Sequence, residues 1–143
     1  MEDTKIAKAS ILIQASLASV WEALVNPEII KGYMFGTTVV SDWKEGSPIY
    51  WRSKWQGKSY EDKGTILQFK RLSTLQYSHY SPLTGAADVP ENYHTVTIYL
   101  SELPTGVEVT LTQDNNPTKE AQEHSEKNWK AMLDGLKKYL EKK

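Results

Sequence analysis

The chain has 143 residues, 39% hydrophobic and 24% charged, which predicts a single folded domain over residues 1–143 and excludes a disordered chain. Its 17 Lys and Arg residues nearly balance 18 Asp and Glu residues, which argues against a nucleic-acid binder because such proteins usually carry a basic excess. Cysteine is absent, which excludes disulfides, thiolate metal ligands and a cysteine nucleophile.

The N-terminal residues do not resemble a secretory signal. The first ten residues, MEDTKIAKAS, include acidic residues and lack the apolar stretch of a secretory signal. No apolar run approaches the ~20 residues that a membrane-spanning helix needs. We therefore expect a cytoplasmic protein without a membrane span.

The first third of the chain predicts one strand and two short helices. Residues 5–14 are rich in apolar and β-branched side chains and predict a strand. Ser16 is a good N-cap for a helix over residues 17–24, where apolar side chains recur at helical spacing. Pro27 disfavours continuation of that helix through Asn26 and suits the first turn of a second helix over residues 27–34.

The remainder predicts six strands and one long helix. Period-two segments separated by turn residues cover residues 37–43, 47–55, 60–70, 73–80, 93–100 and 106–113. After Pro117 the apolar period becomes helical, with a stripe that comprises Ala121, Ser125, Trp129, Met132, Leu136 and Leu140. This order predicts an α+β fold in which a curved antiparallel sheet wraps around the long C-terminal helix. A cavity should remain where the sheet curves away from the helix.

Side chains with polar tips fall on the strand faces that should point toward this helix. Alternation along the strands groups them with aliphatic core residues. We predict that these strand residues line a ligand cavity, which residues of the helix close. The predicted lining residues on the strands are Trp51, Tyr77, His79, His94 and Gln113, and those on the helix are Trp129 and Met132. The alternative is that these polar tips bond to backbone or water and that side chains fill the space.

The sequence offers little for metal, cofactor or acid–base chemistry. His79 and His94 lie on neighbouring predicted strands, but no third ligand stands at metal-binding spacing, and no nucleotide-binding or hydrolase motif is present. We therefore predict no metal, no cofactor and no catalytic residue. The carboxylates, Asp62 among them, are expected outside the cavity, in loops, near helix caps or on polar faces, which leaves the histidines and tyrosines as the interior titratable groups.

Four segments resemble a known family. They are VWEALVNPEIIKGYMFG (20–36), WKEGSPI (43–49), GTILQFKRLSTLQY (64–77) and NWKAMLDGLKKYL (128–140). Together they are similar to the SRPBCC (START/pollen-allergen-like) superfamily, in the branch of the activator of the heat-shock protein 90 ATPase. The resemblance implies a helix-grip fold with a cavity for an apolar ligand. Where the family often has a second Trp after the Pro-Glu pair, this chain has Tyr33 and Phe35.

Three functions follow as hypotheses. The first is binding of a small, largely apolar, lipid-like or aromatic molecule, with the loop Pro82–Asn92 as a mobile rim of the cavity. The second, implied by the resemblance, is a chaperone-associated interaction domain. The eukaryotic activator has an additional N-terminal domain that this sequence lacks, so we expect no stimulation of a heat-shock protein 90 ATPase. The third is an enzyme that acts on a hydrophobic, polyketide-like substrate in the same cavity.

Overall fold

The fold was described from a computed structural model, which covers residues 5–34, 36–55, 57–82, 85 and 87–141. Seven antiparallel strands form one sheet in the order β1-β7-β6-β5-β4-β3-β2. The strands are β1 (Lys5–Ile13), β2 (Thr38–Ser41), β3 (Pro48–Trp55), β4 (Lys58–Lys70), β5 (Thr74–His79), β6 (His94–Leu103) and β7 (Gly106–Asn116). The helices are α1 (Leu17–Val25), α2 (Pro27–Tyr33) and α3 (Lys119–Glu141), with a short 3₁₀ turn, η2 (Pro90–Asn92), before β6.

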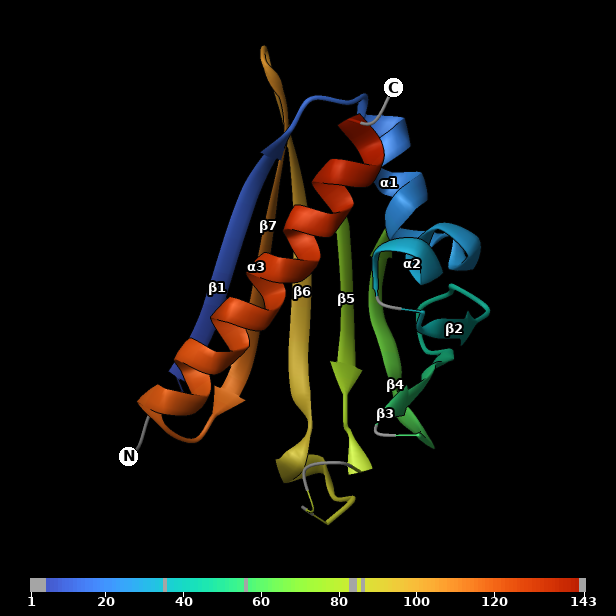
Figure 1. Ribbon diagram of the computed structural model, residues 1–143, viewed down its shortest axis with the longest axis vertical. Coiled ribbons are helices and arrows are strands. Elements are labelled where there is room, and N and C mark those ends of the chain that lie inside the picture. The colour runs from blue at the N-terminus through green and yellow to red at the C-terminus, as the bar shows by residue number, and fades with distance from the viewer. Residues whose placement is uncertain (1–4, 35, 56, 83–84, 86, 142–143) are drawn as a thin grey trace.

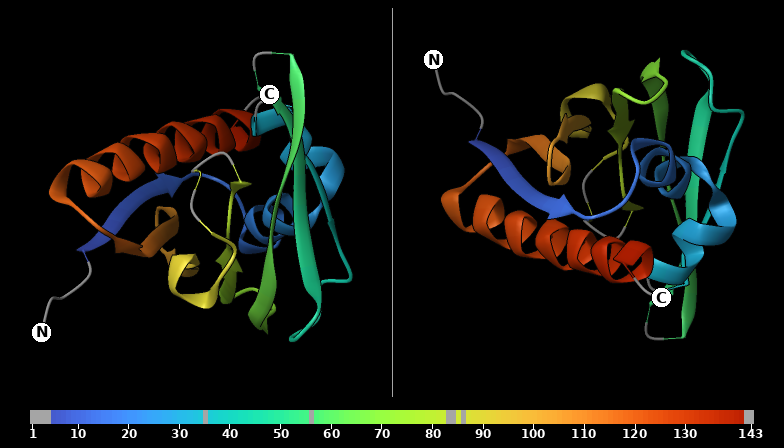
Figure 2. Two further views of the ribbon diagram at one scale, coloured as in Figure 1. Left: turned by 90° about the horizontal axis from the view of Figure 1, so that it is seen from below. Right: turned by 90° about the horizontal axis from the view of Figure 1, so that it is seen from above.

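The helix α3 runs diagonally across the inner face of the sheet (Figure 1). Seen along its length, the sheet curves from β1, which lies beside α3, round to β3 and β4 (Figure 2). The helices α1 and α2 lie between α3 and that end of the sheet. This is the predicted helix-grip arrangement, and the α+β prediction is confirmed. Within the described residues, no helix combines the length and the apolar character that crossing a membrane requires.

Local signals explain where the short helices begin. The Ser16 hydroxyl accepts a hydrogen bond from the Ser19 N–H at 3.1 Å, as expected of an N-cap. The Asn26 side chain accepts one from the Glu28 N–H at 3.0 Å, and Pro27 occupies the first turn of α2, where its missing N–H costs nothing. The two caps hold α1 and α2 as separate helices joined at Asn26.

The core lies between the inner face of the sheet and the helices. Along β7, Val107, Val109 and Leu111 are fully buried, as period two predicts. On α3 the fully buried residues are Leu133 and Leu136, whereas Trp129, which the predicted stripe includes, stays partly exposed. Each fully buried aliphatic side chain stabilises the fold by about 1.5–3 kcal/mol. This packing fixes α3 on β1 and β7 and leaves its middle turns facing β3 to β5.

Some strand ends differ from the sequence prediction. The strand β4 begins at Lys58, two residues earlier than expected, and β6 and β7 each continue three residues further. Turn-forming polar residues suggested earlier ends, but backbone pairing with the neighbouring strands carries these segments on. Tyr60 and Asp62 lie within β4, as the predicted strand over residues 60–70 implies, and both are paired with residues of β3.

Candidate functional site

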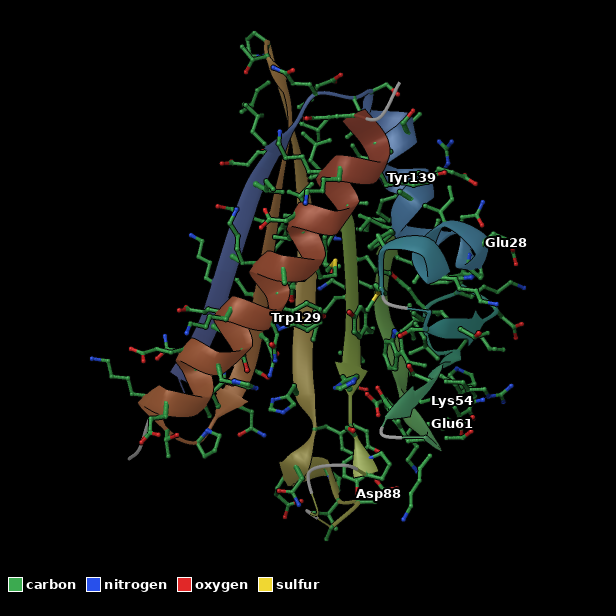
Figure 3. All side chains as sticks on the ribbon, viewed as in Figure 1. Glu28, Lys54, Glu61, Asp88, Trp129 and Tyr139 are labelled. Carbon is green, nitrogen blue, oxygen red and sulfur yellow. The ribbon has the colours of Figure 1, made fainter. Side chains whose placement is uncertain are left out.

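A cavity of about 210 Å³ lies between α3, the segment after α2, and the strands β3, β4 and β5. Figure 3 shows Trp129 on α3, where the helix crosses the strands. A second space of about 30 Å³ adjoins it and shares Met34, Trp51 and Tyr77. The larger cavity is lined by Met34, Thr37, Trp51, Ser53, Tyr60, Asp62, Tyr77, His79 and Trp129.

Aromatic rings form the wall of the cavity on the sheet side. The centroid of the Trp51 ring lies 5.0 Å from that of the Tyr77 ring and 4.9 Å from that of the His79 ring. The Trp51 and His79 rings meet edge-on. These residues come from β3 and β5, which flank β4. Ring pairs at such separations contribute about 0.5–1.5 kcal/mol beyond the area they bury. The contacts therefore hold the rings in place as a preformed apolar surface.

One end of the cavity carries a pair of ionisable side chains. The His79 Nε2–H donates a hydrogen bond to Asp62 Oδ2 at 2.9 Å, and the two side chains are 25% and 15% exposed. The other carboxylate oxygen, Oδ1, is buried and has no hydrogen-bond partner in the described part of the chain. A buried polar atom without a partner is uncommon and marks a place where a ligand or water is expected to bind.

The position of Asp62 corrects the sequence analysis. We expected this carboxylate outside the cavity, but it lines the cavity from β4, opposite Trp51 of β3. Ile66 is fully buried on the inner face of the same strand, and period two places residues 62 and 60 on that face too. Counting back from Ile66 would have found both Asp62 and Tyr60.

The structure brings together most of the residues predicted to line the cavity. Trp51, Tyr77, His79 and Trp129 line the larger space, and Met132 lines the smaller one. Sequence reasoning had left out Met34 and Thr37, which lie at and after the end of α2 and could be assigned to the cavity only from the tertiary structure.

His94 and Gln113 are absent from the lining of both spaces. The His94 Nδ1–H donates to the backbone oxygen of Asp114 at 2.9 Å, and its ring lies 6.5 Å from that of His79. Gln113 Oε1 accepts a hydrogen bond from the Trp129 indole N–H. Gln113 therefore orients Trp129, and neither His94 nor Gln113 meets the space itself.

Two tyrosines in this region are held in the neutral form. Burial raises the pKa of Tyr77 and of Tyr33 above the ordinary value near 10. The Tyr33 hydroxyl donates to the Ala23 backbone oxygen at 2.8 Å. No described residue forms a hydrogen bond with the Tyr77 hydroxyl, so this group remains available to a ligand as donor or acceptor.

The predicted rim lies partly outside the described residues, since Pro82–Asn92 includes positions 83, 84 and 86. In the described part, Asp88 forms an ion pair with Lys63 and accepts a hydrogen bond from the Tyr93 hydroxyl at 2.6 Å. The Lys63 ammonium and this hydroxyl hold the pKa of the Asp88 carboxyl below its usual range. These contacts tie Asp88 to β4 and to Tyr93, the residue before β6, and the role of the loop as a rim stays a prediction.

A larger and more open groove, of about 770 Å³, shares Ser53 and Tyr60 with the cavity. Its lining includes the ion pair between Arg52 and Glu61, whose side chains are 57% and 43% exposed. Arg52 thus faces away from the core, as alternation along the strand predicts. Exposed, charged walls suit solvent better than an apolar molecule, so the smaller, aromatic-lined cavity is the better candidate site.

Comparisons with known proteins agree with this architecture. The family described as "Activator of Hsp90 ATPase homolog 1-like protein" matches residues 14–141. The solution structure of a protein from Cytophaga hutchinsonii is similar to this chain with 67% identity and a TM-score of 0.88, over 99% of this chain and 97% of that one. No match is found among curated proteins.

More distant structures share the fold alone. The Aha1 dimer from Colwellia psychrerythraea has 20% identity and a TM-score of 0.76, over 96% of this chain and 97% of that one. The crystal structure of Ara h 8.0201 has 11% identity and a TM-score of 0.75, over 96% of this chain and 97% of that one. The helix-grip arrangement is thus retained where little of the sequence is.

Proposed function

This chain belongs to the family of Activator of Hsp90 ATPase homolog 1-like proteins, within the SRPBCC superfamily, and we propose that it binds a small, largely apolar aromatic ligand in the 210 Å³ cavity. The observation that supports this most directly is the wall of Trp51, Tyr77 and Trp129 around a space that these side chains do not fill. Preformed apolar pockets with a few polar groups are the usual sites for small molecules.

The volume of the cavity limits the size of the ligand. An apolar cavity of about 150 Å³ in another protein binds benzene, and drug-sized ligands occupy about 300–1,000 Å³. A space of about 210 Å³ lies between these values. We therefore propose a ligand with one substituted ring or two fused rings, rather than a long lipid chain.

Naphthalene is a suitable probe for a first test. Binding in the cavity should quench tryptophan fluorescence, because Trp51 and Trp129 line it, and should raise the melting temperature through preferential binding to the folded state. Ser53→Phe places a ring in the cavity and should abolish both effects. Ser101→Phe, at an exposed position on β6, is the matched control and should retain them.

Two outcomes would contradict the proposal. If neither naphthalene nor a panel of one-ring and two-ring hydrocarbons quenches the fluorescence or stabilises the wild-type protein, the cavity is not a ligand site. The same conclusion follows if Ser53→Phe binds naphthalene as tightly as Ser101→Phe does.

A chaperone-associated role is the second candidate, favoured by the description of the family as homologous to an ATPase activator. It is tested by adding the chain in excess to purified heat-shock protein 90 in a coupled ATPase assay. We expect no stimulation, and a several-fold increase in the ATPase rate would make this role the leading one.

A further inference from the structure

Among the polar residues that line the cavity, Asp62 and His79 form a hydrogen-bonded pair. An ionised carboxylate offers about four lone-pair sites, and Asp62 receives one hydrogen bond, from His79. Its Oδ1 receives none from the described residues. The carboxylate is therefore a strong acceptor with most of its capacity unused, beside an apolar space.

The imidazole ring of His79 adds a second acceptor. A carboxylate only accepts, so the hydrogen bond to Asp62 places the proton of His79 on Nε2. In the neutral ring Nδ1 then carries a lone pair, and no described residue donates to it. Asp62 thus fixes the tautomer of His79, and the pair presents acceptors from both β4 and β5.

The described lining contains no lysine or arginine that would bind an anion. A ligand carboxylate in this cavity would lie near the Asp62 carboxylate without a compensating cation, and like charges at short range are unfavourable. An O–H or N–H group would instead supply the missing donor. We propose that the ligand is an aromatic compound with a hydroxyl or N–H donor, recognised by the Asp62–His79 pair, and that carboxylate ligands such as fatty acids are disfavoured.

This inference rests on the proposed function and names the chemistry of its ligand. It requires a small local adjustment, because Oδ1 is buried in the structure as it stands. The terminal torsion of an aspartate side chain is broad, so a partial rotation of the carboxylate can bring Oδ1 toward the cavity while His79 stays within reach of Oδ2. A water molecule on Asp62 is the competing possibility, which the experiment below tests.

The experiment compares three probes of nearly equal size, namely naphthalene, 2-naphthol and 2-naphthoate, by isothermal titration calorimetry at pH 7. A hydrogen bond to a charged acceptor should make 2-naphthol bind roughly tenfold tighter than naphthalene. The anionic 2-naphthoate should bind more weakly than 2-naphthol by at least the same factor. Because this ranking is measured on the wild-type protein, it does not depend on whether a variant folds.

Asp62→Asn then tests the residue itself. His79 still has an oxygen to donate to, and the free group of residue 62 becomes an N–H₂ donor instead of an acceptor. We expect the preference for 2-naphthol over naphthalene, measured as the ratio of their affinities, to disappear in this variant. Glu61→Gln is the matched control, because it removes the same charge one residue away, at an exposed ion pair with Arg52, and should keep the preference.

The results separate the two proposals. If naphthalene and 2-naphthol bind with equal affinity, or if Asp62→Asn retains the preference, the ligand does not donate a hydrogen bond to Asp62 and water does so instead. The inference is then wrong, while the proposed function stands. Preferential binding of 2-naphthoate also overturns it. If none of the three probes binds, the proposed function itself fails.

Discussion

Gly64 on β4 occupies a position where a side chain cannot be accommodated, and replacing it with alanine tests how the site is built. A Cβ atom at this position would lie 1.7 Å from the backbone oxygen of Ser78 and 2.6 Å from its carbonyl carbon. Real Cβ atoms essentially never come closer than 3.0 Å to such a neighbour. In Gly64→Ala, β4 and β5 must therefore move apart by more than about 1 Å at this point.

The cost follows from what holds the two strands together here. Lys63 and Tyr80 exchange backbone hydrogen bonds of 2.9 and 2.8 Å, and the Thr65 N–H donates to the Ser78 hydroxyl at 2.9 Å. Losing these bonds costs about 1 kcal/mol each, and overpacking a dense interior adds about 1–3 kcal/mol. We expect Gly64→Ala to lower the free energy of unfolding by about 4–6 kcal/mol, a large part of the roughly 5–15 kcal/mol typical of a domain.

Urea denaturation followed by tryptophan fluorescence measures this change. Gly32→Ala is the control, because a Cβ at this position in α2 meets nothing within 4 Å, and it should be neutral or stabilising by up to about 1 kcal/mol. Separation of the strands should also part Asp62 from His79 and weaken binding of 2-naphthol. An unfolding free energy of Gly64→Ala within about 1 kcal/mol of wild type would refute the reasoning, since a backbone clash cannot be relieved by a side-chain rotation.

Three further predictions concern the core and the cavity wall. Leu133→Ala should lower the free energy of unfolding by about 3 kcal/mol in urea denaturation, because this residue is fully buried, and a loss below about 1 kcal/mol would contradict its place in the core. Trp129→Phe should cost about 1–2 kcal/mol in the same measurement, because Gln113 loses its donor while buried, and an unchanged midpoint would count against that hydrogen bond. Burial raises the pKa of Tyr77, so the unfolded chain ionises first and stability falls as the pH rises above about 10, whereas below that value it is unaffected. Tyr77→Phe should flatten this alkaline decline, measured as urea midpoints between about pH 9 and pH 11, and an equal decline in both proteins would show that Tyr77 does not contribute.

Much of the fold could be predicted because its signals are local. Alternation along residues 106–113 identified the buried face of β7, and the cap at Ser16 and the proline at position 27 defined the short helices. The apolar stripe on α3 was predicted from its spacing, although Leu133 was missed and Trp129 is less buried than its size suggested. Each of these features depends on residues within a few positions of one another, so a periodic pattern is sufficient to find it.

The pattern of the strands predicted the part of the candidate site that lies on β3 and β5. Alternation along the strands predicted that Trp51, Tyr77 and His79 point inward, and the structure gathers them around one cavity. Alternation predicts the same inward direction for His94 and Gln113. These residues lie on β6 and β7, beyond β5, and do not line the cavity. Alternation predicts which face of a strand a residue lies on, whereas the position of the strand in the curved sheet decides whether that residue lines the cavity.

The sequence by itself determined the order of the elements and the inward faces of the strands, because the periods of strands and helices are properties of the local backbone. Only the tertiary structure decided that Asp62 meets His79. Seventeen positions separate them along the chain, and they meet because β4 approaches β5 closely where Gly64 has no side chain. Such pairing depends on the combined packing of distant segments, which no local pattern records, and the chemistry proposed for this cavity rests on it.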